Sequence, residues 1–294
     1  MIDALRGDAL LREAVIALLV GVMLLGVAIW FDERNANRAE TMATLQFNES
    51  NRLAHEQNER AEVLENTRFV RQAAMTAAEI LPFQSLNLVG AMLAGLPLGC
   101  DVSSDPGRVS CASFHQANLT DASLAFGDLT GANLSFAKLT GGILARAKLN
   151  GADLTGADMV GAHLNGAQLN GADLSNTDMT GADLTGADLS FADLSFADLT
   201  QANLAEVRLA DGRLTDADLT GADLTRAHLT GADLGFAKLA GADLARADLT
   251  DADLTGADMV YATLTSANLD HVCYTSATTW PAGFTPPPAT CPPS

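Results

Sequence analysis

A five-residue repeat dominates the sequence and restricts the folds that the chain can adopt. From Leu119 to Leu269 every fifth residue, 31 positions in all, is Leu or Met, and Ala stands two places before 26 of them. The unit is Ala-Asp-Leu-Thr-Gly, whose places we number one to five. A period of five matches neither the 3.6 residues of a helical turn nor the two of a β-strand. A chain that turns once in every five residues can instead bury every Leu.

The repeat extends beyond this segment in both directions. It runs over 112–276 without an insertion, with Phe114 and Tyr274 in the Leu place near its ends. The block at 81–100 has no charge and shows the same alternation before an interruption at 101–110. Its prolines and polar side chains are poorly suited to lipid, so we predict a further coil rather than a membrane span. Residues 81–111 are therefore assigned to a first coil and its loop.

The repeat resembles that of the pentapeptide-repeat proteins, whose unit is a small residue, Asp or Asn, Leu or Phe, a variable residue and often Gly. The resemblance implies an all-β solenoid, a right-handed quadrilateral β-helix in which four pentapeptides form one coil. The Leu and Ala side chains are then expected inside and the others outside. The end at 277–294 resembles a Trp-Pro-x-Gly-Phe ending common in this family, which implies that Trp280 and Phe284, near Tyr274, cap the last coil.

The N-terminal part is predicted to be a long α-helix that includes one transmembrane span. After a tail at 1–13, residues 14–31 carry no charge and are long enough to cross a bilayer. A cleaved signal peptide is the alternative interpretation, although the flanking residues lack its small-residue cleavage pattern. Residues 32–80 contain no Gly or Pro and are predicted to form a helical stalk.

The four cysteines fall into two local pairs. Cys100 and Cys111 bracket the interruption of the repeat, and Cys273 and Cys291 bracket the C-terminal cap. Two disulfides fit this placing and indicate an oxidising compartment, whereas reduced thiols in the cytosol are the alternative. We therefore favour a cell-membrane protein with an extracytoplasmic repeat domain. The basic residues flanking the span, two on each side, do not determine its orientation.

The chain is strongly acidic, with a formal charge of -19, which excludes binding to nucleic acid through a basic surface. Stacking of rows twenty residues apart sorts the second-place residues onto four faces, and two adjacent faces carry ladders of aspartate. These candidate partner-binding residues are Asp153, Asp173, Asp193, Asp233 and Asp253 on one face and Asp158, Asp178, Asp198, Asp218 and Asp258 on the next.

Three phenylalanines add a second surface feature. Phe136, Phe196 and Phe236 occupy the fifth place, normally Gly, at one corner of the expected coil. An exposed aromatic strip beside aspartates is suited to anchor a partner. The alternative is that the rings only cover neighbouring turns.

The sequence contains no motif for catalysis, and no enzyme activity, cofactor or metal site is predicted. We expect a membrane-tethered scaffold whose acidic rod binds a cationic protein or cations, with a homodimer through the stalk or a rod end also compatible. One alternative is an inert spacer in which Asp is the default solvent-facing residue. The other follows from the resemblance, because some cytosolic members mimic DNA and inhibit type II topoisomerases.

Overall fold

A computed structural model of this protein describes Met23, Leu25, Met42 and residues 44–74, 83–100 and 111–291. The chain divides into two units, Met1–Arg60 and Ala61–Ser294. In the part of the chain that is described, no helix is both long and apolar enough to cross a membrane. The predicted tail at 1–13 and span at 14–31 lie outside the described residues, apart from Met23 and Leu25.

Residues 44–74 form one α-helix. The stretch has no Gly or Pro, and its Glu, Gln, Arg and Ala residues favour helix, as predicted. The guanidinium of Arg52 lies 2.7 Å from Glu49 and 2.6 Å from Glu56, one turn away on either side. All three side chains are exposed, so these pairs contribute little to the stability of the helix. The remainder of the predicted stalk at 32–80 lies outside the described residues, apart from Met42.

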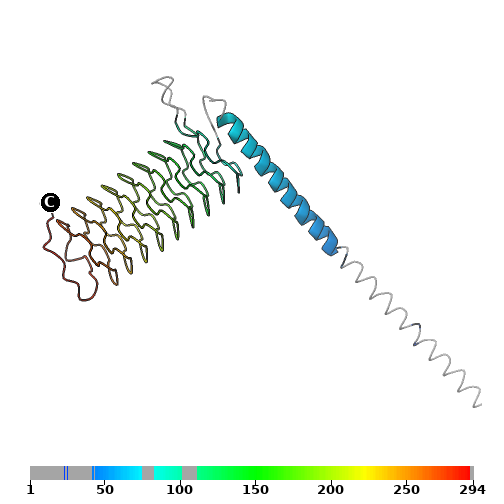
Figure 1. Ribbon diagram of the computed structural model, residues 1–294. Helices are drawn as coiled ribbons and strands as arrows, with labels where there is room; N and C mark the ends of the chain where they lie inside the picture. The colour runs from blue at the N-terminus through cyan, green and yellow to red at the C-terminus, as the bar shows by residue number, and fades with distance from the viewer. Residues whose placement is uncertain are drawn as a thin grey trace, which may run out of the picture. The chain divides into compact units, whose positions relative to one another are not determined.

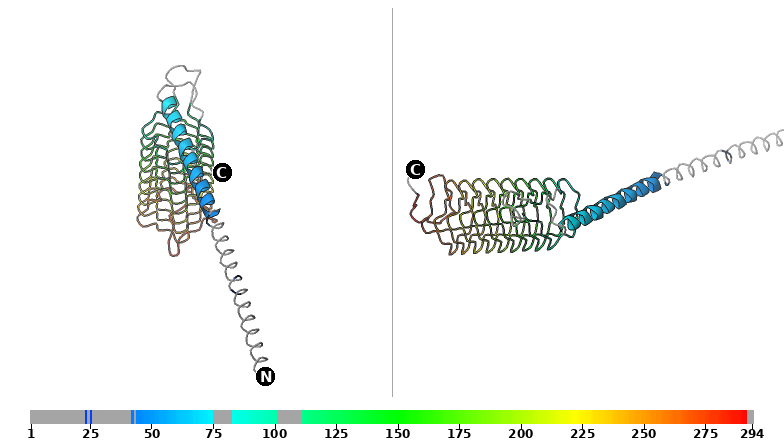
Figure 2. Two further views of the ribbon diagram at one scale, coloured as in Figure 1. Left: turned by 90° about the vertical axis from the view of Figure 1, so that its right-hand side faces the viewer. Right: turned by 90° about the horizontal axis from the view of Figure 1, so that it is seen from above.

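Residues 83–100 and 112–280 wind into a four-sided β-helix of stacked coils (Figure 1 and Figure 2). Each side contributes one β-bridge residue, in the second place of the repeat, and a turn follows it. Asp153 pairs in parallel with Asp173, and Asp173 with Asp193, which makes the register twenty residues per coil. The Leu that follows each of them therefore joins one column, as the period predicted.

The block at 83–100 is the first coil of this solenoid. Three parallel bridges join it to the second coil, the first of them between Asn87 and Asn118. Pro97 stands in the second place, where the N–H of later coils donates to the preceding coil. The first coil has no coil before it, so the missing donor of Pro97 leaves nothing unpaired. The uncharged block is thus part of the β-helix and not a membrane span, as expected.

The Leu and Ala columns form the hydrophobic core. Every third-place residue from Leu119 to Met259 is fully buried, and each first-place Ala between them is at most 1% exposed. Met159 and Met179 replace Leu in the column with little change of volume. Complete burial of one such side chain stabilises the fold by about 2 kcal/mol, so these columns supply most of the favourable free energy of folding.

A tight turn in the fourth and fifth places forms each corner. Between Leu154 and Ala157, the Ala157 N–H donates to the Leu154 carbonyl at 2.9 Å, and Gly156 has a φ of 64°. A positive φ at the third of four turn residues, and not at the second, is the type II pattern that favours Gly. Other residues hold the same position at many corners, among them Asn176 at 58° and Phe196 at 62°.

The C-terminal part of the helix covers the first coil. Val70 is fully buried, and the ring of Phe69 meets that of Phe83 edge-on with centroids 5.8 Å apart. Asn66 Nδ2 donates to the Asn87 carbonyl at 3.0 Å. This carbonyl faces no preceding coil, so the side chain replaces the missing backbone donor. The end of the predicted stalk therefore caps the solenoid, which needs a cover over its exposed core.

The five-residue register ends earlier than predicted. Asp258 bridges Thr279 across 21 residues, whereas the other bridges beyond the first coil span 20. One residue is therefore inserted between Tyr274 and Thr279, and the unbroken repeat predicted up to Ser276 is corrected to end at Tyr274. The insertion brings Trp280 into the Leu place of the final side.

Three aromatic side chains close the C-terminal end, as the resemblance implied. Trp280 lies edge-on to Tyr274 with ring centroids 5.1 Å apart and stacks on Phe284 at 5.4 Å. All three pack against the buried core. The Tyr274 hydroxyl donates to the Pro287 carbonyl at 2.7 Å, which holds the Pro-rich tail against the last coil.

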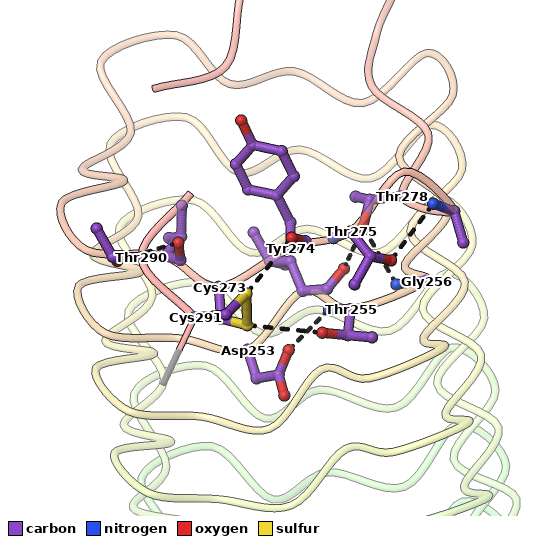
Figure 3. The surroundings of a disulfide bond; sticks show 12 residues. Asp253, Thr255, Gly256, Cys273, Tyr274, Thr275, Thr278, Thr290 and Cys291 are labelled. Atoms are coloured by element: carbon purple, nitrogen blue, oxygen red, sulfur yellow. Dashed lines mark hydrogen bonds between the residues drawn. A yellow bond between two sulfur atoms is a disulfide. The ribbon is translucent and has the colours of Figure 1, made fainter. Parts of the chain in front are cut away.

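Both predicted disulfides are formed. One joins Cys100 to Cys111 across the interruption, and the other joins Cys273 to Cys291 at the end of the tail (Figure 3). Beside the second bond, the Thr290 N–H donates to the Val272 carbonyl at 3.1 Å, so the tail adds backbone pairing at the open edge. In the chain-entropy model a disulfide closing a loop of this length stabilises the fold by about 3 kcal/mol.

We expect Gly181→Ala and Gln201→Gly to change stability in opposite directions. Both residues hold the fifth place at one corner, in adjacent coils, with φ of 64° and 56°. A methyl group on Gly181 would meet no atom within 4 Å, so only backbone strain counts. Gly181→Ala should lower the free energy of unfolding by about 1 kcal/mol and Gln201→Gly raise it by about 0.5 kcal/mol. Chemical denaturation measures both, and shifts of equal sign would contradict the turn assignment.

Candidate partner-binding surface

An aspartate in the second place completes the backbone hydrogen bonding of its repeat. In the repeat at 177–181, the N–H groups in places two, three and five donate to neighbouring coils, and that in place one donates within the turn. The N–H in place four, of Thr180, donates instead to Asp178 Oδ1 at 3.0 Å, and the Thr180 hydroxyl donates to the same oxygen at 2.7 Å. Asp178 thereby supplies the one acceptor that the stacked coils lack.

Asparagine in the second place makes the same bond, so the fold requires an oxygen atom there but not a charge. All sixteen second-place aspartates between Asp128 and Asp258 accept from the N–H two residues on, and five asparagines do likewise. The asparagines are Asn87, Asn118, Asn133, Asn203 and Asn268.

The charge of these aspartates contributes little to the stability of the fold. A carboxylate accepts a stronger hydrogen bond than an amide does. Two unit charges about 4.8 Å apart on successive coils, however, repel each other by about 0.9 kcal/mol in water. The two effects are similar in size and opposite in sign. Backbone hydrogen bonding alone therefore does not account for the preference for Asp over Asn.

The structure brings the ten predicted aspartates together on two adjacent sides of the β-helix. The first face is the bridged column that runs through Asp153, Asp173, Asp193, Arg213, Asp233 and Asp253. The second face is the column through Asp158, Asp178, Asp198, Asp218, Lys238 and Asp258. Each face thus holds five carboxylates and one base within six successive coils.

The two bases neutralise only their nearest neighbours. Arg213 lies 3.0 Å from Asp193 Oδ2, and Lys238 lies 3.1 Å from Asp218 Oδ2. Lys148 meets Asp128 on another face in the same way, at 3.4 Å from Oδ2. In each pair Oδ1 stays with the backbone while Oδ2 accepts the cation. The other eight predicted aspartates make no ion pair with described residues.

The paired aspartates have pKa values below the ordinary one. Partial burial acts to raise the pKa of Asp193, but the hydrogen bonds from Ser195 and the charge of Arg213 outweigh it. The same balance lowers the pKa of Asp218, through Thr220 and Lys238. These carboxylates therefore remain charged to lower pH than an isolated Asp.

Phe136, Phe196 and Phe236 lie on the edge between the two faces, which we call the acidic edge. Their side chains are 56%, 60% and 58% exposed. The structure thus places the predicted rings and aspartates on one continuous surface. The alternative role of covering neighbouring turns also holds for two of the rings, because Phe136 and Phe236 lie against Gly156 and Gly256 of the next coil.

The charge is uneven around the β-helix, as the two predicted aspartate ladders indicated, but the sequence analysis missed what the edges between the faces add to this difference. The acidic edge and its two faces carry eleven acidic and three basic side chains, a net -8, whereas the diagonally opposite edge and its faces carry seven and five, a net -2. Beyond the ten aspartates, the acidic side holds Asp216, Lys138, Arg213 and Lys238. The opposite side holds Asp128, Asp183, Asp188, Asp223, Asp243, Asp248, Glu206, Lys148, Arg208, Arg146, Arg226 and Arg246. The sequence signal for this difference was the arginines in the fifth place, Arg146, Arg226 and Arg246. Their spacing is a multiple of twenty residues, so they lie on one edge of the β-helix.

The described residues contain no group of three His, Cys, Asp or Glu arranged to hold a metal ion. Within the same residues, every buried side-chain nitrogen or oxygen has a hydrogen-bond partner. What the described part of the chain offers a ligand is a surface of fixed charges with exposed rings.

The repeat matches the family model described as pentapeptide repeats, with eight copies. The matched segments are 108–135, 128–166, 167–205, 202–235 and 232–270. They cover more than half of the chain, and the stacked coils have the geometry that such a repeat requires. The chain therefore belongs to the pentapeptide-repeat family.

One solved structure of a pentapeptide-repeat protein, HetL, shares the fold, and two further solved structures show a weaker similarity. HetL, from the cyanobacterium Nostoc sp. strain PCC 7120 and involved in heterocyst differentiation regulation, is 30% identical over 72% of this chain and 96% of its own, with a TM-score of 0.51. Rfr23, from the cyanobacterium Cyanothece 51142, is 34% identical over 35% of this chain and 66% of its own, with a TM-score of 0.24. QnrB1, a plasmid-mediated fluoroquinolone resistance protein, is 20% identical over 63% of this chain and 88% of its own, with a TM-score of 0.42. A search of curated proteins found no match.

Replacing Asp178 separates its hydrogen bond from its charge. Asp178→Asn should leave the free energy of unfolding within about 0.5 kcal/mol of the wild type, because the amide oxygen can accept both bonds from Thr180. Asp178→Ala should lower it by about 1.5 kcal/mol, because the Thr180 N–H loses its acceptor. Urea denaturation of the two variants tests this, and equal losses would contradict the role assigned to Oδ1.

The ion pairs should also make stability depend on pH in a defined direction. Because the pKa of Asp193 and of Asp218 is lowered in the folded state, their contribution is present above the unfolded pKa of about 3.9 and lost as the pH falls through the folded value. The variant Arg213→Gln/Lys238→Gln should melt at a lower temperature than the wild type at about pH 6 and at the same temperature at about pH 2. A difference that persists in acid would contradict this assignment.

Proposed function

We propose that this chain is a non-enzymatic scaffold whose acidic β-helix binds a positively charged protein. The observation that carries the proposal is the net -8 on one side of the β-helix against -2 on the other. The fold needs the oxygen atoms of the second-place aspartates but not their charge. A concentration of charge that the fold does not use is the footprint expected of electrostatic recognition.

The internal ion pairs indicate how a partner would be held. In all three second-place pairs, with Lys148, Arg213 and Lys238, the base meets Oδ2 while Oδ1 keeps its backbone bond. An external Lys or Arg can approach the unpaired aspartates in the same way. Because Oδ1 already fixes each carboxylate, binding costs little side-chain entropy.

We further propose that the helical N-terminal part tethers the scaffold to a membrane through 14–31, with the β-helix on the extracytoplasmic side. The uncharged sequence of this segment supports the tether. The two disulfides support an oxidising compartment. Deletion of 1–31 should move the protein from the membrane to the soluble fraction of a cell lysate, and continued membrane association would contradict the tether.

Mimicry of DNA is the second candidate function, and charge density favours it. Between Asp153 and Asp258 the sequence holds 19 acidic and five basic residues, a net -14. This is about one charge per 1.8 Å of axis, against about 1.7 Å for duplex DNA. The target of such a mimic would be a type II topoisomerase. The uneven distribution of charge around the β-helix favours a partner on one side instead.

The proposal is tested with two variants that each replace six aspartates by Asn, which keeps the Oδ1 bonds. One changes Asp153, Asp158, Asp173, Asp178, Asp198 and Asp233 on the acidic side. The matched control changes Asp128, Asp183, Asp188, Asp223, Asp243 and Asp248 on the opposite side. Binding of a fluorescent twelve-residue polylysine peptide to the full chain in detergent is measured by anisotropy at low salt.

The acidic-side variant should bind the peptide about tenfold more weakly than the wild type, and the control variant only about twofold more weakly. Equal losses would show that net charge rather than the acidic side governs binding. Absence of binding by the wild type would contradict the proposal and leave an inert spacer. Inhibition of DNA supercoiling that the acidic-side variant loses would favour the mimic.

A further inference from the structure

The phenylalanines of the acidic edge occupy a position that suits neither their size nor their polarity. Phe136, Phe196 and Phe236 have φ of 57°, 62° and 58°, a region that bulky residues rarely adopt. More than half of each side chain is exposed, so little of the benefit of burying an aromatic ring is realised within this chain. Residues of many kinds hold this place at other corners, and the acidic edge itself has Asn176 there. The fold therefore gains little from these three rings.

Two of the three rings are nevertheless held against the next coil. A methyl group on Gly156 would lie 2.7 Å from the Phe136 ring, and one on Gly256 would lie 2.6 Å from the Phe236 ring. Phe136 and Phe236 thus lie over the turn of the next coil, where only Gly leaves room for the ring. A rigid, exposed aromatic side chain is well suited to anchor a partner, because little freedom is lost on binding.

The charge around the rings limits what can lie on them. The two flanking faces are strongly acidic, so a nucleic acid, an anionic membrane surface or the same edge of a second copy would be repelled. The bases of the fifth place, Arg146, Arg226 and Arg246, lie on the diagonally opposite edge. A ligand that covers the rings must therefore combine apolar groups with positive charge.

We infer that the acidic edge docks an amphipathic basic helix, with its apolar stripe on Phe136, Phe196 and Phe236 and its Lys or Arg residues over the two acidic faces. Successive coils lie about 4.8 Å apart, close to the 5.4 Å pitch of an α-helix, whereas same-face residues of a β-strand lie about 6.7 Å apart. A helical ligand therefore matches the spacing of the coils better than an extended one. Five coils separate the outer rings, about 24 Å, which a helix of about 16 residues spans. This inference rests on the proposed function and assigns its partner class.

Two peptides distinguish this inference from general attraction to charge. Both are helical 18-residue peptides with the same number of Lys residues, and one carries a Leu stripe where the other carries Gln. The test variant is Phe136→Asn/Phe196→Asn/Phe236→Asn, because Asn tolerates a positive φ and is already present at Asn176. The matched control is Phe126→Asn, whose side chain is 63% exposed at φ 58° on the opposite edge. Affinities are measured by anisotropy with the full chain.

The wild type should bind the Leu peptide at least about tenfold more tightly than the Gln peptide. The triple variant should lose this preference and keep its affinity for the Gln peptide, while Phe126→Asn should change neither. Equal binding of the Leu peptide to the wild type and the triple variant overturns the inference but leaves the proposed function standing. If neither peptide binds the wild type, both are contradicted.

Discussion

One hydrogen bond recurs wherever Asp or Asn holds the second place, which is the case in most repeats of the β-helix. Stacked coils satisfy three of the five N–H groups of a unit and the turn satisfies a fourth, while the second-place side chain satisfies the remaining one, as Asp178 does for Thr180. This explains why the unit places Asp or Asn before each Leu and Ser or Thr after it. The hydroxyl donates to the same oxygen and holds the side chain against its own turn.

The same bond separates the structural from the binding role of the aspartates. Because Oδ1 belongs to the backbone, only Oδ2 is available to other groups, and Arg213 and Lys238 show how a cation uses it. The fold accepts Asn equally well, so the distribution of charge could change without loss of the β-helix. The interpretation of Asp as a default solvent-facing residue therefore accounts for the oxygen and not for the charge.

Both ends of the β-helix need groups that the repeat does not provide. At the start, Asn66 and Val70 of the helix supply a hydrogen-bond donor and an apolar cover for the first coil. At the other end, an inserted residue shifts Trp280 into the core column, and the disulfide of Cys273 fixes the tail. The interior of the repeat can then consist of little more than Leu and Ala, because the ends prevent its exposure.

The sequence by itself determined the period, and the period determined the core columns, the four faces and the positions of the ten aspartates and three phenylalanines. These positions could be predicted because a strict register converts spacing along the chain into position in space. Only the tertiary structure showed the Oδ1 bond to the fourth-place N–H, the cap at Asn66 and the shift before Trp280. These depend on which atoms meet across a turn or between coils. Spacing alone does not specify such contacts.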